Sequence, residues 1–135
     1  MNRAVLADTG PLYAAVDPDD AYHRRAREEL RRLAQEKRSV VIAYPTLLES
    51  HSLVLRRLGT RTATVWLKEI LSASALLNPS PQDYLQAAAR IASLPDQSVT
   101  LFDGIIAVLA KRTGAQVWTY DHHFDVMRVR VWRVT

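Results

Sequence analysis

The 135-residue chain contains no cysteine. This absence excludes disulfide bonds, zinc sites built from thiolates and cysteine nucleophiles. The sequence also lacks an apolar run of membrane-spanning length, and its first residues, MNRAVLADTG, do not follow the pattern of a secretory signal peptide. We therefore expect a cytoplasmic protein that has no membrane partner.

Extremes of composition are absent as well. Apolar residues make up 48% of the chain and charged residues 24%, which is ordinary for a globular protein and excludes extensive disorder. The net charge of +4 and the isoelectric point of about 9.8 are mildly basic and compatible with a nucleic-acid partner. Without repeats or linkers, residues 1–135 are expected to form a single domain.

Short apolar segments alternate with longer segments of helical periodicity. The first strand ends in an Asp8-Thr9-Gly10-Pro11 turn, and Gly114 suits the position just past the helix that Asp103 opens. Strands are predicted over 3–8, 39–43, 75–77, 116–120 and 129–134, and the other helices over 17–37, 45–58, 60–74 and 81–94. This alternation predicts an α/β fold whose mainly parallel sheet is covered by helices on both faces.

Acidic residues fall at corresponding places in this pattern. Asp8 ends the first strand, and Glu49 lies near the start of the helix that follows the second. Asp103 opens the helix before the strand that Asp121 ends. Ligands of such sheets bind beyond the carboxyl ends of the strands, so we expect all four carboxylates at one edge.

Taken alone, each of these acids has a structural explanation. Asp8 suits a turn, while Thr46 to Glu49 and Thr100 to Asp103 both match a helix-capping pattern. Together, the four occur in the apolar contexts VLAD, TLLE, TLFD and WTYD, and converging carboxylates repel one another unless a divalent cation lies among them. Oxygen ligands suit Mg²⁺ or Mn²⁺, and those ions support phosphoryl chemistry on polyanions.

Three motifs in this order carry a resemblance: ADTGPL at the end of the first strand, YPTLLES after the second, and DQSVTLFDGIIAVLAKRTGAQVWTYDHHFD before the last. The whole chain resembles PIN-domain ribonucleases of the VapC toxin type. The resemblance implies a PIN-like three-layer α/β/α sandwich with about five parallel strands. It also implies a Mg²⁺- or Mn²⁺-dependent endoribonuclease with an RNA substrate, a homodimer, and a cognate VapB-like antitoxin.

The same resemblance assigns residues. Asp8, Glu49, Asp103 and Asp121 take the acidic positions that are both catalytic and metal-binding, and the hydroxyl residues beside the first and last acids are Thr9 and Thr119. The family more often has alanine after the third acid. Here that residue is Gly104.

Other polar residues near this edge carry weaker signals. Asp96 and Asp125 are candidates for contributing to the site through water, although loop or capping roles also explain them. His122 and His123 are adjacent, so their side chains point in different directions, and we expect both to be exposed in a loop. Helix 17–37 has a basic face that is either simply solvated or contacts RNA phosphates or an acidic partner. Its charged residues are Arg24, Arg25, Arg27, Arg31, Arg32, Lys37 and Arg38 against Glu28, Glu29 and Glu36.

Three other functions match parts of the sequence. Asp8-Thr9-Gly10 is also the signature of retroviral-type aspartic proteases, but their all-β architecture is incompatible with the helical pattern here. A phosphoaspartate phosphatase needs a second acid two residues after its nucleophile, where this chain has Gly10. A non-catalytic PIN domain that binds RNA or protein stays open, although the intact set of acids argues against it.

Overall fold

A computed structural model describes residues 3–134. The strands form one parallel sheet in the order β3-β2-β1-β4. Their bounds are β1 (Val5–Ala7), β2 (Val40–Ala43), β3 (Ala75–Leu77) and β4 (Gln116–Trp118). Parallel pairing requires a crossover between neighbouring strands, and helices make every crossover here.

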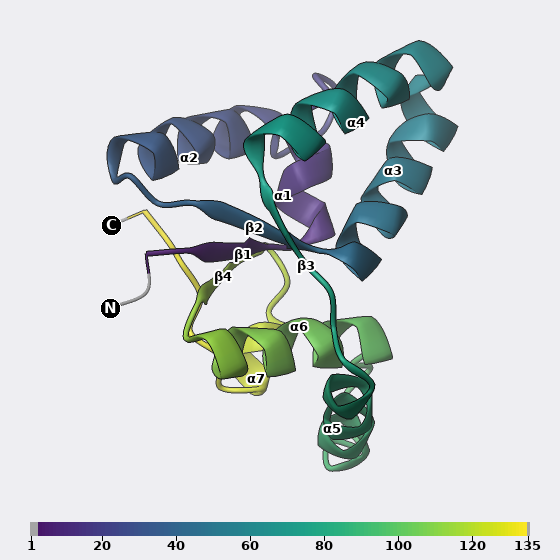
Figure 1. Ribbon diagram of the computed structural model, residues 1–135, viewed down its shortest axis with the longest axis vertical. Helices are drawn as coiled ribbons and strands as arrows, with labels where there is room; N and C mark the ends of the chain where they lie inside the picture. Colours follow the sequence, from purple (N-terminus) through teal and green to yellow (C-terminus); the bar gives the residue numbers. More distant parts are fainter. Residues whose placement is uncertain (1–2, 135) are drawn as a thin grey trace.

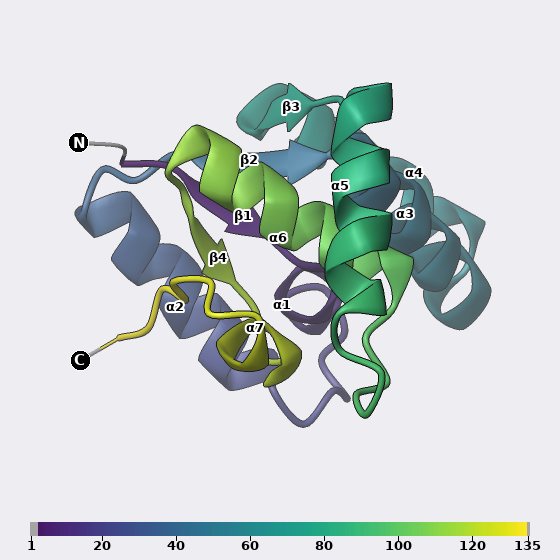
Figure 2. The same ribbon diagram turned by 90° about the horizontal axis from the view of Figure 1, so that it is seen from below.

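Helices cover both faces of this sheet (Figure 1). One face carries α1 (Thr9–Ala14), α2 (His23–Gln35), α3 (Tyr44–Leu58) and α4 (Thr60–Ala73). The other carries α5 (Pro81–Ala92), α6 (Leu101–Thr113) and α7 (His123–Val126), which lie in front of the sheet in Figure 2. The predicted three-layer α/β/α sandwich is therefore confirmed.

Two hydrophobic cores follow from the alternation of side chains along the strands. On β1, Val5 and Ala7 face the core beneath α1–α4, whereas Leu6 faces the core beneath α5–α7. Both faces of each strand are covered, which explains why the strands read as continuous apolar runs. The three tryptophans are buried in the first core: Trp66, Trp118 and Trp132.

The fifth strand is shorter than predicted. Within residues 3–134 the segment expected over 129–134 pairs with β4 through a single parallel bridge, Val117 to Val131. The amide of Val117 donates to the Arg130 carbonyl at 2.9 Å, and its carbonyl accepts from the Trp132 amide at 2.8 Å. Just before the bridge, Arg128 has a positive φ of 58°, and the Val129 amide donates to the Phe124 carbonyl at 3.0 Å and not to β4.

Two helix starts also differ from the prediction. The turn expected at Asp8 is the start of α1, which Asp8 caps by accepting from the Thr9 amide at 2.9 Å. The next helix begins at His23 and not at Asp17, because Asp17 accepts hydrogen bonds from the Asp19 amide and from a tyrosine hydroxyl. These bonds hold a local turn that competes with the helix.

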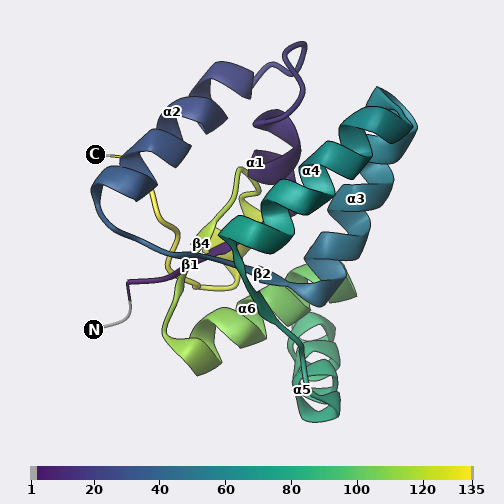
Figure 3. The ribbon, with the colours of Figure 1, turned by 45° about the horizontal axis from the view of Figure 1, so that its top comes forward.

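Several large apolar side chains of α3 and α4 face solvent. α3 and α4 lie side by side as an antiparallel pair (Figure 3), and each presents one side to the sheet and its neighbour. Leu48 on α3 is 68% exposed, and Val65 and Leu71 on α4 are about half exposed. The helical period predicted these helices correctly, but only part of their apolar surface is buried.

Gly104 permits the close approach of α5 to α6. A Cβ atom on Gly104 would lie 2.9 Å from Cγ2 of Ile91 and 3.2 Å from the carbonyl oxygen of Ala87. The β-branched side chain and the backbone have little freedom to move away. We predict that Gly104→Ala lowers the free energy of unfolding by about 1 kcal/mol, because an overpacking cost of roughly 1–3 kcal/mol exceeds a helix-propensity gain of roughly 1 kcal/mol.

The matched control is Gly10→Ala. The nearest atom to a Cβ there is 3.9 Å away, in the ring of Tyr120, so the same substitution should be neutral or stabilising. Urea denaturation of the wild type and both variants measures the difference. If Gly104→Ala were as stable as Gly10→Ala, the close packing would not constrain this position.

Candidate functional site

An open pocket of about 690 Å³ lies at the carboxyl ends of the strands. Asp8 reaches it from the end of β1 and Asp121 from the segment after β4, while Asp103 and Glu49 come from the first turns of α6 and α3. The four acids singled out in the sequence thus line one pocket. The rest of its lining is formed by Thr9, Gly10, Ser98, Thr100, Phe102, Tyr120, His122 and His123.

Asp8 is the most constrained of these acids. It is only 7% exposed, and its two oxygens accept from the Thr9 amide at 2.9 Å and from the Thr119 hydroxyl at 2.7 Å. Burial raises the pKa of Asp8 to about 6 against the lowering effect of these hydrogen bonds, and the charges of Asp103 and Asp121 add to the increase. The carboxylate is held in place but is costly to ionise when the pocket has no cation.

Asp103 serves as a helix cap and lines the pocket. Its Oδ2 accepts from the Thr100 amide at 3.2 Å, while the Thr100 hydroxyl accepts from the Asp103 amide at 3.0 Å, which completes a capping box at the start of α6. The side chain is 9% exposed. The side chain of Asp103 therefore both caps helix α6 and lines the pocket, as each of the two explanations of this acid requires.

Glu49 stands at the more open side of the pocket. Partial desolvation raises its pKa, the charge of Asp103 raises it further, and a hydrogen bond with the Thr9 side chain lowers it. The Thr9 hydroxyl also accepts from Ser50 at 3.5 Å. Thr9 therefore connects the capping turn of α1 to the acid on α3.

Thr119 joins the first and last acids. Its hydroxyl donates to Asp8 and accepts from the Asp121 amide at 2.9 Å. Asp121 in turn accepts from the His123 amide at 2.9 Å, which holds the turn that leads into the short helix α7. One buried hydroxyl thus fixes the relative positions of the ends of two neighbouring strands.

His123 was expected to be exposed, and that expectation was wrong. Its side chain is 17% exposed, and Nδ1 lies 3.2 Å from Oδ1 of Asp121 and 3.5 Å from Oδ2 of Asp103. A sequence signal for this contact existed. When an aspartate side chain accepts a hydrogen bond from the amide two positions later, the turn that forms brings that later residue close to the aspartate. His122 is 77% exposed, as predicted.

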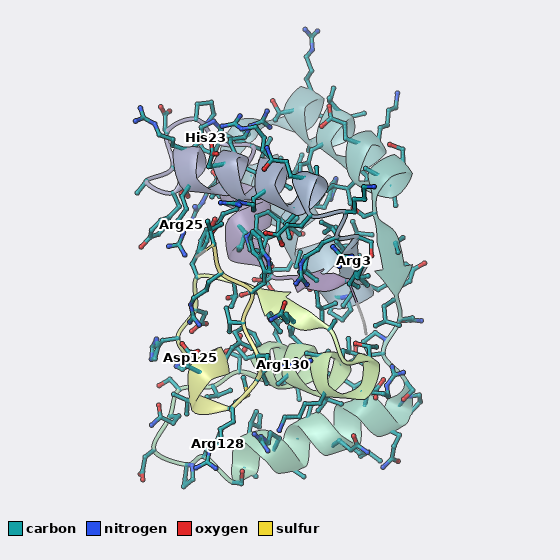
Figure 4. The ribbon with its side chains drawn as sticks, turned by 90° about the vertical axis from the view of Figure 1, so that its left-hand side faces the viewer. Arg3, His23, Arg25, Asp125, Arg128 and Arg130 are labelled. Atoms are coloured by element: carbon teal, nitrogen blue, oxygen red, sulfur yellow. The ribbon has the colours of Figure 1, made fainter. Side chains whose placement is uncertain are left out.

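The two weaker acidic candidates do not line the pocket. Asp125 forms an ion pair with Arg133 at 2.9 Å on the exposed side of α7, where Figure 4 labels it. Asp96 is exposed in the loop between α5 and α6. Neither position supports a role at the site.

The donor set fits a divalent cation. Asp121, His122 and His123 each offer a ligand atom, and these atoms lie within 4.8 Å of one another. Nδ1 of His123 is buried, and within residues 3–134 no hydrogen bond meets the geometric requirements for it. Carboxylate oxygens are typical ligands of hard divalent cations and imidazole nitrogens of transition metals, so this group of side chains is compatible with a divalent cation without selecting one.

The prediction also treated Glu29 as part of the exposed face of the basic helix, and this was wrong. Glu29 is 5% exposed and accepts from the indole N–H of Trp118 at 3.0 Å and from the Tyr120 hydroxyl at 2.5 Å. Tyr120 itself lines the pocket. Sequence reasoning missed this contact because the partners are about ninety positions apart along the chain.

The raised pKa of Asp8 generates a pH prediction. The unfolded acid titrates near 3.8 and the folded acid near 6, so the folded state binds this proton more tightly, and the stability gained below pH 3.8 is lost as pH rises through 6. The Asp8→Asn variant does not titrate at this position, so its stability is not lowered by deprotonation. With a chelator present, the variant should therefore gain stability relative to wild type from pH 4 to pH 7, by up to about 3 kcal/mol. Thermal melts across this range measure it, and a difference independent of pH would contradict the prediction.

Comparisons with known proteins agree with this geometry. A family model described as PIN domain matches residues 5–129. A comparison with curated proteins finds no match. The chain is similar to the structure of VapC20 from Mycobacterium tuberculosis, described as a toxin that cleaves the sarcin-ricin loop. The TM-score is 0.83 at 21% identity, covering 96% of this chain and 99% of that one.

Two further structures have the same fold. VapBC2 from Rickettsia felis, solved with a DNA fragment from its promoter, matches with a TM-score of 0.76 at 16% identity over 96% of this chain and 97% of that one. FitAcB from Neisseria gonorrhoeae matches with a TM-score of 0.69 at 22% identity over 96% of both chains. With a family model that covers nearly its whole length and this pocket at the carboxyl edge of its sheet, the chain belongs to the PIN domain family.

Proposed function

We propose that this chain is a divalent-cation-dependent endoribonuclease. The observation that carries the proposal is the convergence of Asp8, Glu49, Asp103 and Asp121 on one pocket. Membership in the PIN domain family and the likeness to a toxin described as cleaving the sarcin-ricin loop support the choice of RNA as substrate. The excess of basic residues over the whole chain suits a polyanion.

The residues take distinct roles in this proposal. Asp8 and Asp103 are the principal ligands of the cation, and Glu49 and Asp121 complete the site directly or through water. Such a cation supplies activation of water and stabilisation of charge on the phosphoryl oxygens. One carboxylate of the set orients or deprotonates the attacking water, and Thr119 holds Asp8 in register with Asp121 through its hydroxyl. In-line attack at phosphorus leaves 5′-phosphate and 3′-hydroxyl ends, with no role for the 2′-hydroxyl.

The biological role that we propose is the toxin of a VapBC-type pair, acting in the cytoplasm as a homodimer and inhibited by a VapB-like antitoxin. The similarity of the fold to VapC20, which is described as a toxin, and to VapBC2, which was solved with a DNA fragment from its promoter, supports this role. Exposed apolar side chains on α3 and at the start of α6 support an interface between copies, among them Tyr44, Leu48 and Leu101. None of the helices within residues 3–134 is long and apolar enough to span a membrane.

The nuclease proposal predicts that Asp103→Asn abolishes RNA cleavage, by at least about a hundredfold, while the protein stays folded. The amide keeps an oxygen that can accept from the Thr100 amide, so the cap of α6 is preserved. The measurement is incubation with total RNA, with and without Mg²⁺ or Mn²⁺, followed by mapping of the fragment ends.

Glu69→Gln on α4 is the control, since this exposed carboxylate does not line the pocket. It should cleave like wild type. Cleavage by Asp103→Asn at the wild-type rate would remove Asp103 from the site. A folded, cation-supplied wild type that binds RNA without cutting it would favour the non-catalytic alternative.

Cation binding has a second readout that does not depend on activity. Millimolar Mn²⁺ or Mg²⁺ should raise the melting temperature of the wild type, because the ion binds the folded state; occupancy at one hundred times Kd stabilises by about 2.7 kcal/mol. Asp121→Asn should gain less from the ion, yet be more stable than the wild type in chelator, because one like charge is gone. Melting curves near pH 7.5 test this, and a cation-insensitive wild type with a destabilised Asp121→Asn would contradict the metal site.

A further inference from the structure

An aromatic and cationic wall borders the acidic pocket. The ring of Tyr120, which lines the pocket, lies 5.0 Å from the ring of Tyr22, at an interplanar angle of 38°. The guanidinium carbon of Arg25 lies 4.3 Å from the centre of the Tyr120 ring and 5.9 Å from that of Tyr22. Tyr22 and Arg25 are three residues apart at the start of α2, so they share one side of the helix.

A buried carboxylate holds this wall in place. Glu29 accepts from the Tyr120 hydroxyl at 2.5 Å through Oε1 and faces Nε of Arg25 at 3.3 Å through Oε2. The indole of Trp118 donates to the same carboxylate. The orientation of Tyr120 and Arg25 is thus set from the protein interior, which lowers the entropic cost of binding on their outer side.

The outer side of the wall is open. Tyr22 is 50% exposed, and the side chain of Arg25 is 49% exposed. Figure 4 shows Arg25 between α2 and the yellow segment that follows β4. Glu29 with Trp118 and Tyr120 would be enough to attach α2 to the sheet. The exposed ring and guanidinium add a π surface and a positive charge beside a negatively charged pocket.

We propose that Tyr22, Arg25 and Tyr120 form a subsite that stacks a nucleobase of single-stranded RNA next to the acidic pocket. Unpaired bases stack on tyrosine rings and on guanidinium planes with little dependence on sequence. Arg25 uses Nε toward Glu29, which leaves the other N–H groups of the guanidinium to meet phosphate or base oxygens. The inference rests on the proposed ribonuclease function and adds to it the residues that receive the substrate.

The experiment separates binding from cleavage. Short single-stranded RNA carrying 2-aminopurine is titrated with the Asp103→Asn protein, and fluorescence quenching reports stacking while anisotropy reports Kd. Tyr22→Leu and Arg25→Gln should each raise Kd about tenfold, and Tyr22→Leu should lose most of the quenching. Tyr22→Phe keeps the π surface and should bind like the parent. In the active protein with cation, Tyr22→Leu should raise KM more than it lowers kcat.

Matched controls exist on the same chain. Tyr84→Leu removes a tyrosine on α5 that is 40% exposed and does not line the pocket. Arg32→Gln removes one exposed positive charge from α2, about two turns beyond Arg25. Both should change Kd by less than about twofold. Circular dichroism and melting curves check that each variant is folded, and Tyr22→Phe keeps the test decisive if Tyr22→Leu is unstable.

The outcomes are distinguishable. Wild-type binding and quenching in Tyr22→Leu, with cleavage intact, would overturn the stacking subsite and leave the ribonuclease proposal standing. Weaker binding in Arg25→Gln alone would indicate an anion site read by charge, as for an acidic peptide, and would also overturn it. Loss of stacking in Tyr22→Leu but not in Tyr22→Phe, in a wild type that cuts no RNA with any cation, would support the subsite and overturn the nuclease.

Discussion

Burial of carboxylates at one edge of the sheet, to which their mutual repulsion adds, is the constraint on which the rest of this structure depends. The local architecture compensates for it with fixed dipoles. Asp8 and Asp103 each sit at the start of a helix, where free amides and the helix dipole favour negative charge. Thr119 adds a hydroxyl donor to Asp8. The pKa of Asp8 is raised nonetheless, so these donors offset only part of the cost of burial and crowding.

The same groups that shape the backbone also shape the pocket. In the sequence, capping and metal binding are competing explanations of Asp103, but the capping box and the pocket lining use the same side chain. A cap locks the carboxylate to its own helix, which is a simple means of orienting it. Glu49, which does not cap α3, is correspondingly more exposed. Structural and functional roles of an acid at a helix start are therefore not alternatives that sequence reasoning should weigh against each other.

Much of the fold was predictable because its signals are local. The capping patterns before α5 and α6, the glycine after α6 and the apolar runs of β1 to β4 depend on a few neighbouring residues. The convergence of the four acids followed from parallel topology alone. The errors have a different origin. The length of the last pairing, the burial of Glu29 and the contacts of His123 depend on segments that meet only in the folded chain.

Glu29 illustrates why a charge pattern is an incomplete guide to a basic helix. Its neighbours on α2 include exposed arginines, so the sequence pattern suggests that Glu29 is exposed as well and pairs with them in solvent. In the fold, Glu29 accepts hydrogen bonds from Trp118, the last residue of β4, and from Tyr120 two residues later. It thereby ties α2 to the strand that leads into the pocket. An unpaired buried carboxylate would be strongly destabilising, and the indole of Trp118 and the hydroxyl of Tyr120 supply it with donors from the protein interior. The basic helix is in this way fixed to the edge where the acids converge, and opposite charges stand side by side around the place where a phosphodiester would bind.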